Sequence, residues 1–92
     1  MKDQNFLTEN NARHMWHPMA HPAEMQANPP RVIVGAKGVR ITDVDGHETV
    51  DAVGGLWNVN LGYSCKPVKQ AISEQLEALP YYSTFRGTSN DK

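Results

Sequence analysis

The chain has 92 residues, nine basic and ten acidic, with a formal net charge of −1 at pH 7. A chain of this length holds at most one small domain, which buries only about 60 to 70% of its unfolded surface and is marginally stable. Because the charges are balanced and scattered, they create no field that would attract nucleic acid or an anionic membrane, and neither partner is expected.

The single cysteine, Cys65, excludes an internal disulfide and favours a reducing, cytoplasmic location. Residues 1–5 carry an acid at the third position, and no apolar run follows them, so the order of residues typical of a secretory signal is missing. No apolar stretch approaches the about 20 residues that a membrane span needs. The sequence therefore predicts a cytoplasmic protein without a membrane segment.

Residues 1–30 are predicted to form an extended N-terminal arm. They are rich in Asn, His, Met and Pro, and four prolines between positions 18 and 30 exclude long regular structure after about Trp16. Such a segment buries little apolar surface against itself. Because it carries Met15, Trp16 and Met19, we expect it to lie across another surface.

Residues 31–51 are predicted to form an antiparallel meander of three short strands. An apolar run, the glycine turn at 35–38 and the alternating pattern of 39–43 are typical of a hairpin. The Asp-Gly pair at 45–46 favours a second tight reversal, after which 48–51 return as the third strand.

Residues 52–65 are predicted to form an irregular glycine and tryptophan loop. Gly54 and Gly55 let the backbone turn freely, and an aromatic side chain beside them indicates a wall that faces a ligand. Two plainer interpretations stay open, in which Trp57 and Phe85 are core residues and the glycines only allow a turn. Because neither GxGxxG nor GxxxxGK[ST] occurs, a turn is favoured over contact with phosphate.

Residues 66–79 are predicted to form a helix, since their apolar residues share one face at helical spacing. Pro67 suits the first helical position and Pro80 stops the helix. Residues 80–92 are predicted to form an aromatic loop. One meander and one helix cannot cover its side chains together with those of the loop at 52–65, so we expect the chain to be incomplete.

Three N-terminal imidazoles, of His14, His17 and His21, are enough ligands for zinc. Prolines directly after His17 and His21 break any helix that would align the rings, and no cysteine or acid lies close by. Capping or interface roles are therefore favoured, and no metal is expected.

Three separated motifs resemble the N-terminal end of class III aminotransferases, the pyridoxal-phosphate enzymes of omega-amino acid and pyruvate transamination. They are MWHPM at 15–19, DAVGGLWNVNLGY at 51–63 and LPYYSTF at 79–85. The resemblance spans about residues 12–89. It implies an α+β segment within the small domain of a fold type I pyridoxal-phosphate-dependent transferase, with 52–65 as an active-site loop and 80–92 at the start of the large domain.

The resemblance also implies a substrate site. Leu56 and Trp57 would form one wall of the pocket, with Met19 on the same side, although the family commonly has an aromatic residue at the position of Met19. Phe85 would enter from the neighbouring subunit of a homodimer, with Tyr82 nearby. No residue of this chain is implied in the catalytic step itself, and its cofactor-binding residues stay unknown.

The implied reaction transfers an amino group from an omega-amino acid or amine to pyruvate or another oxo acid through pyridoxal 5'-phosphate. Omega-amino acids, beta-alanine, taurine and amines all stay open as donors. The family's catalytic lysine falls beyond residue 92, so we expect these residues alone to be inactive and not to bind the cofactor covalently. The alternative hypothesis is a free-standing, non-enzymatic module that binds a protein partner through its aromatic tail.

Overall fold

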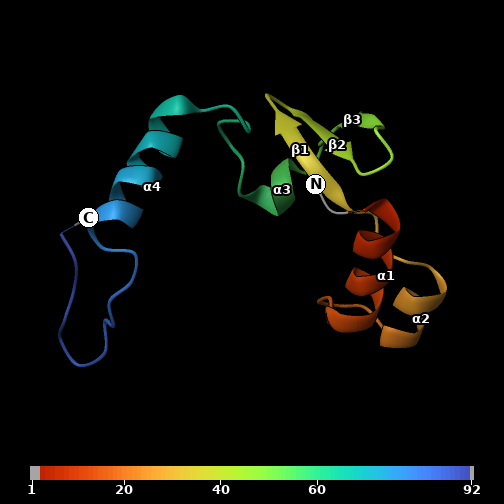
Figure 1. Cartoon of the computed structure of the whole chain (residues 1–92). Helices are drawn as coiled ribbons and strands as arrows, with labels where there is room; N and C mark the ends of the chain where they lie inside the picture. Colours follow the sequence, from red (N-terminus) through yellow and green to blue (C-terminus); the bar gives the residue numbers. More distant parts are fainter. Residues whose placement is uncertain (1–2, 92) are drawn as a thin grey trace.

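The computed structural model describes residues 3–91 and shows an open chain of small elements (Figure 1). Residues 1–2 and 92, which include Lys2 and Lys92 and the outer ends of the predicted arm and aromatic loop, lie outside the described residues. The elements are helices α1 (Gln4–His14), α2 (Pro22–Ala27), α3 (Gly54–Trp57) and α4 (Lys66–Ala78), and strands β1 (Ile33–Lys37), β2 (Arg40–Asp43) and β3 (Glu48–Val50).

The N-terminal segment forms two helices that pack against each other, so the prediction of an extended arm is wrong for α1 and α2. The Asp3 side chain caps α1 by accepting a hydrogen bond from the Asn5 N–H. Pro22 occupies the first position of α2, where the backbone N–H that proline lacks would have no partner within the helix. The His21 ring caps this helix by accepting a hydrogen bond from the Ala23 N–H. The prolines therefore separate the helices and begin one of them.

The three strands form an antiparallel sheet in the order β1-β2-β3, which confirms the predicted meander. β1 is longer than expected. It continues through Gly35 to Lys37, and the pairing of Lys37 with Arg40 leaves only Gly38 and Val39 in the turn. Gly38 supplies the positive φ, 60°, that the first position of such a two-residue turn requires.

Helix α4 confirms the helix predicted at 66–79 and ends at Ala78, before Pro80. Its apolar face is exposed, with 45% of Val68, 56% of Ile72 and 56% of Leu76 accessible. Figure 1 shows why, because α4 extends away from the sheet on the side opposite α1 and α2. None of the described helices is long and apolar enough to span a membrane.

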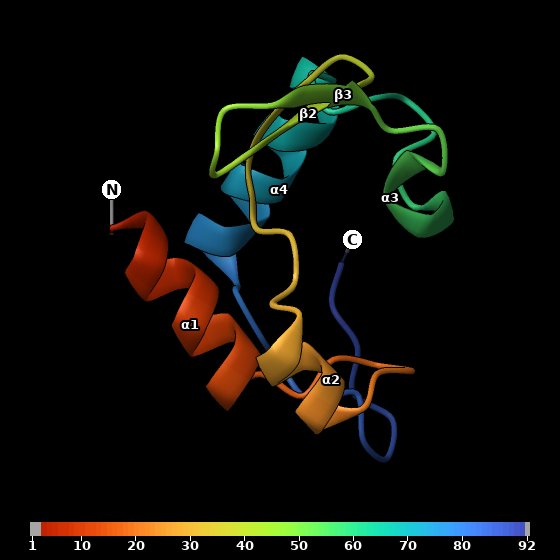
Figure 2. The same cartoon turned by 90° about the vertical axis from the view of Figure 1, so that its right-hand side faces the viewer.

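Within residues 3–91, Ala12 is the one buried hydrophobic residue. The radius of gyration is 17.1 Å, whereas a compact domain of this length has about 12 to 13 Å. The turned view in Figure 2 likewise shows the elements spread around a gap rather than stacked in layers. Hydrophobic burial between the elements therefore contributes little to the stability of this fold.

We expect the isolated chain to unfold without a cooperative transition, because residues 3–91 form no hydrophobic core whose loss would couple the elements. Near-ultraviolet circular dichroism during heating, together with binding of a dye for exposed apolar surface, measures this. A sharp single melt of a monomer with dispersed amide resonances would contradict the expectation.

Candidate functional site

The segment α3 is a left-handed turn. Its four residues, Gly54 to Trp57, have φ values between 55° and 72°. The Asn58 N–H donates to the Gly54 carbonyl at 3.0 Å and closes the turn. Glycine adopts this conformation freely, whereas each other L-residue pays about 1 to 2 kcal/mol. Leu56 and Trp57 are therefore held in a strained backbone, more sharply defined than the irregular loop expected from the sequence.

A single carboxylate oxygen holds this turn from outside. Oδ2 of Asp51 accepts hydrogen bonds from the Gly55 N–H at 2.6 Å and from the Tyr63 hydroxyl at 2.5 Å. The Tyr63 hydroxyl, followed by the Gly55 N–H, lowers the pKa of Asp51, and the same carboxylate raises the pKa of Tyr63. At neutral pH the pair is thus a charged acceptor and a protonated donor.

Both ends of the segment at residues 51–64 are hydrogen-bonded to the β1–β2 turn. The Tyr63 N–H donates to the Gly38 carbonyl at 2.8 Å, and the Gly38 N–H donates to Ser64 Oγ at 2.8 Å. At the other end, the Asp51 N–H donates to the Val39 carbonyl at 2.9 Å. Residues 51–64 therefore form a loop whose two ends lie close together and are hydrogen-bonded to the hairpin.

Two glycines allow the close contacts that this loop makes. A Cβ at Gly62, where φ is 73°, would lie 2.9 Å from the Gly38 carbonyl oxygen. A Cβ at Gly55 would lie 2.6 Å from Val59 Cγ2. Both positions need the absence of a side chain because other parts of the chain approach closely.

The loop presents its large side chains outward. Trp57 is 82% exposed and Leu56 is 66% exposed. A shallow hollow adjoins the turn, between residues 58–62 and the beginning of α4 at Cys65 and Val68. The turn is thus a rigid support for apolar surface that the described residues leave uncovered.

The other residues predicted for the site lie elsewhere. Met19 is fully exposed and has a φ of 58°. Tyr82 and Phe85 are also exposed, and the Arg86 guanidinium lies 5.7 Å from the centre of the Phe85 ring. In both Figures 1 and 2, the α1–α2 connection and the segment after α4 are apart from α3. This chain does not itself bring the predicted site residues together.

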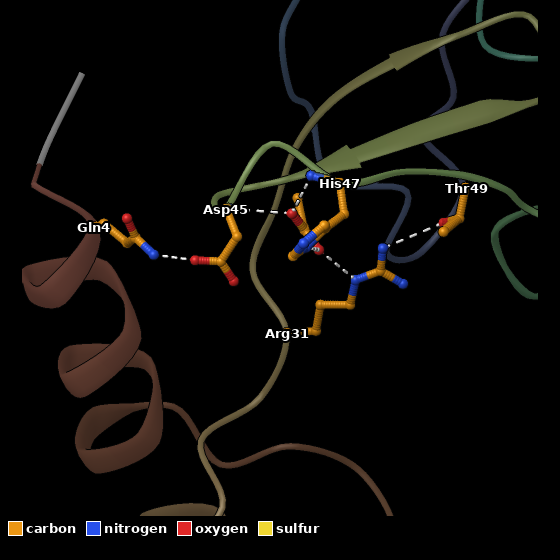
Figure 3. Close-up of polar contacts among 6 residues, drawn as sticks. Gln4, Arg31, Asp45, His47 and Thr49 are labelled. Carbon is orange, nitrogen blue, oxygen red and sulfur yellow. Dashed lines mark hydrogen bonds and ion pairs between the residues drawn. The ribbon is translucent and has the colours of Figure 1, made fainter.

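A second cluster of charged groups surrounds Asp43, which is 4% exposed. Its Oδ1 accepts from the backbone N–H of His47 at 2.8 Å and of Asp45 at 3.1 Å. Its Oδ2 lies 2.9 Å from Arg31 Nε and 3.3 Å from His47 Nδ1. Figure 3 shows Arg31 reaching from this cluster to Thr49. Burial raises the pKa of Asp43, but these hydrogen bonds and charges lower it to a value below the usual one.

This cluster is a structural brace. Asp43, Asp45 and His47 form the one metal-like group of ligand atoms found among residues 3–91, but both Asp43 oxygens already have protein partners. Gln4 of α1 also donates to the Asp45 carboxylate, which joins the N-terminal helices to the sheet (Figure 3). His14, His17 and His21 form no such group in the described part of the chain.

Asp51, Tyr63 and Ser64 were not predicted from the sequence to have roles in the site. One signal was present, because an aspartate shortly before a glycine pair often accepts hydrogen bonds from the backbone that follows it. The contact between Tyr63 and Asp51 had no comparable local signal, since it depends on how the loop closes.

The chain is similar in sequence to a known protein family. The profile of the family Aminotransferase class-III matches residues 21–92. Taurine–pyruvate aminotransferase from Rhodobacter capsulatus is 45% identical over 76 residues, which cover 82% of this chain and 17% of that protein. The chain spans about a fifth or less of the length of the curated relatives it matches.

The fold of the chain is also similar to parts of solved transaminase structures. An (S)-enantioselective omega-transaminase from Thermomicrobium roseum matches with a TM-score of 0.85 and 29% identity, over 98% of this chain and 20% of that one. The Pseudomonas jessenii omega transaminase in complex with PMP matches with a TM-score of 0.80 and 28% identity, over 91% and 18%. A variant of the thermostable omega transaminase PjTA-R6 matches with a TM-score of 0.79 and 27% identity, over 91% and 19%. It has a tryptophan, a phenylalanine and an arginine replaced and is engineered for asymmetric synthesis of enantiopure bulky amines.

We expect Gly62→Ala to destabilise a full-length protein that carries this segment by about 1 to 3 kcal/mol, because alanine is strained at this φ and its Cβ meets the Gly38 carbonyl. Gly46→Ala is the matched control, since Gly46 has a φ of 87° but open space where a Cβ would lie. Thermal unfolding of both variants provides the measurement. An equal or smaller loss for Gly62→Ala would contradict the close approach.

Proposed function

The chain belongs to the class III aminotransferase family, and from this premise we propose that it is the N-terminal segment of a transaminase. The proposed reaction transfers an amino group from an omega-amino acid or amine to pyruvate or another oxo acid. At the level of the site, the observation that carries the proposal is the exposed indole of Trp57 on its left-handed turn. The alternative, a free-standing interaction module, finds no support in the comparisons.

In this proposal Leu56 and Trp57 form one wall of the substrate pocket. An exposed aromatic side chain on a strained, well-fixed backbone is more typical of a ligand-binding surface than of a packed core. The PjTA-R6 variant engineered for synthesis of bulky amines supports this assignment. Its replaced tryptophan and phenylalanine are separated by the same number of residues as Trp57 and Phe85.

Part of the proposed pocket comes from a second subunit. We propose that Met19 lies on the side of Trp57, and that Phe85, with Tyr82 nearby, enters from the partner of a homodimer. The open shape of the chain and the exposed apolar face of α4 support an assembly in which other surfaces cover these side chains.

The division into segments is part of the same proposal. The N-terminal segment at 1–30 and the aromatic loop at 80–92 would make contacts outside this chain, while 31–51 form the support, 52–65 the active-site loop and 66–79 the packing helix. A cytoplasmic location without nucleic acid or membrane partners is also proposed, on the evidence of the single cysteine and the net charge of −1.

The proposed cofactor is pyridoxal 5'-phosphate, which supplies an electrophilic carbonyl and an electron sink when it is bound. A PMP complex among the similar structures supports this assignment. The described lysines, Lys37, Lys66 and Lys69, are all exposed, whereas a lysine that bonds to the cofactor needs a site that keeps its amine partly neutral. The described lysines of this chain therefore do not fit the role of bonding covalently to the cofactor.

The contribution of this chain to the reaction is then positioning. The flat indole of Trp57 would orient the side chain of the amino donor and exclude water from one side of it. Leu56 would extend the same apolar wall. Neither residue donates or accepts a proton in the reaction.

We expect Trp57→Ala in the full-length enzyme to change the ratio of kcat/KM for bulky and small amines more than it changes affinity for the cofactor. The reason is that the indole limits the space for the donor and does not contact the cofactor in this proposal. Trp16→Ala is the matched control, because Trp16 is equally exposed at 82%. Unchanged relative kinetics for small and bulky amines in Trp57→Ala would count against the proposal.

We expect the purified 92-residue chain to form no alanine from pyruvate and an amine beyond the rate of added pyridoxal phosphate alone, since its described lysines lack a suitable site. Chromatographic measurement of alanine tests this. Turnover that depends on the chain would contradict the assignment of catalysis to residues elsewhere.

A further inference from the structure

We propose that Asp51 and Tyr63 are positioning residues that set the direction of the Trp57 side chain. This inference rests on the proposed function in one respect, that Trp57 faces the substrate. Neither residue is assigned a contact with the substrate or the cofactor. Their effect passes through the backbone of the left-handed turn.

The first step is that residues outside the left-handed turn must stabilise its backbone conformation. Leu56 and Trp57 both have positive φ, which L-residues with large side chains avoid. Such a conformation persists only where the surrounding structure over-determines it. Hydrogen bonds within the turn, such as that from Asn58 to Gly54, satisfy its backbone but do not fix the turn relative to the sheet.

The second step is that the Asp51 carboxylate supplies this hold. It accepts the Gly55 N–H at 2.6 Å from within the turn, two residues before Trp57. The Tyr63 hydroxyl, on the same oxygen, keeps the carboxylate aimed at that N–H. Charge-assisted hydrogen bonds of this length are stronger than those between neutral groups, so the pair resists rotation of the Gly55 peptide.

The third step is that the Asp51–Tyr63 pair, here called the clamp, is itself held by the sheet. Asp51 and Tyr63 are each anchored through their own backbone N–H groups to neighbouring residues of one hairpin turn, Val39 and Gly38. The distance between the two clamp residues is thereby set by the sheet. A movement of the Trp57 turn requires breaking the contact with Asp51 or detaching the loop from the hairpin.

The test replaces the phenol without removing its ring. In the full-length enzyme labelled with 5-fluorotryptophan, the signal of Trp57 is assigned by its loss in Trp57→Phe. We expect Tyr63→Phe to shift and broaden this signal and to change the bulky-to-small ratio of kcat/KM by about two- to ten-fold, the range that one net hydrogen bond accounts for. Asp51→Asn is expected to act in the same direction, since an amide carbonyl accepts more weakly than a carboxylate.

The matched control is Tyr81→Phe, which removes the hydroxyl of a tyrosine that is 79% exposed in the aromatic segment. We expect it to leave both the Trp57 signal and the ratio unchanged. A purely structural role for Tyr63 would lower the melting temperature but leave the fluorine signal of the native enzyme in place. That result would overturn the inference.

The outcomes separate this inference from the proposed function. A Trp57 signal that is unaltered in both Tyr63→Phe and Asp51→Asn refutes the clamp, whatever Trp57 contacts. A shifted signal in Tyr63→Phe, with unchanged selectivity in Trp57→Ala, supports the clamp and refutes Trp57 as a substrate wall.

Discussion

The backbone of Gly38 is the point on which the candidate site depends. Its carbonyl accepts from the Tyr63 N–H and its N–H donates to Ser64 Oγ, so a single residue of the hairpin turn holds the end of the 51–64 loop through two hydrogen bonds. Gly62 allows the loop to approach the same carbonyl closely, because a Cβ at this position would lie 2.9 Å from the carbonyl oxygen. Because hydrogen bonds between nearby turns fix the loop, the geometry around Trp57 does not need a hydrophobic core beneath it.

Buried or partly buried carboxylates take over much of the role that apolar packing has in other small folds. Asp43 organises the turn between β2 and β3, and through Arg31 it also holds the chain that enters the sheet. Asp51 organises the loop after β3 in the same manner. In both places one side chain collects several donors, and the pKa of each carboxyl lies below its usual value as a result.

The sequence predicted the features that depend on local patterns. The alternation of 39–43, the Asp-Gly pair and the apolar periodicity of α4 were sufficient for the meander and the helix. The prediction of an extended arm was wrong for α1, which contains no proline and has a capping aspartate, and for α2, where Pro22 was interpreted as a break although it begins the helix. It also missed the left-handed turn and the Asp51–Tyr63 contact, because these arise from loop closure and not from any period in the residues. The proposed site residues other than Leu56 and Trp57 lie apart from them in this chain, and in the proposal Phe85 and Tyr82 come from a partner subunit.

The left-handed conformation of Trp57 also affects how a pocket wall at this position evolves. Removing a large side chain from a packed core normally lowers stability, so a wider pocket comes with a weaker fold. At a backbone φ of 72°, an exchange to glycine relieves strain and leaves no cavity in a core, because the indole is mostly exposed. In the proposed site, a wider pocket and a more relaxed backbone are therefore reached by the same exchange, which makes this position an accessible starting point for divergence.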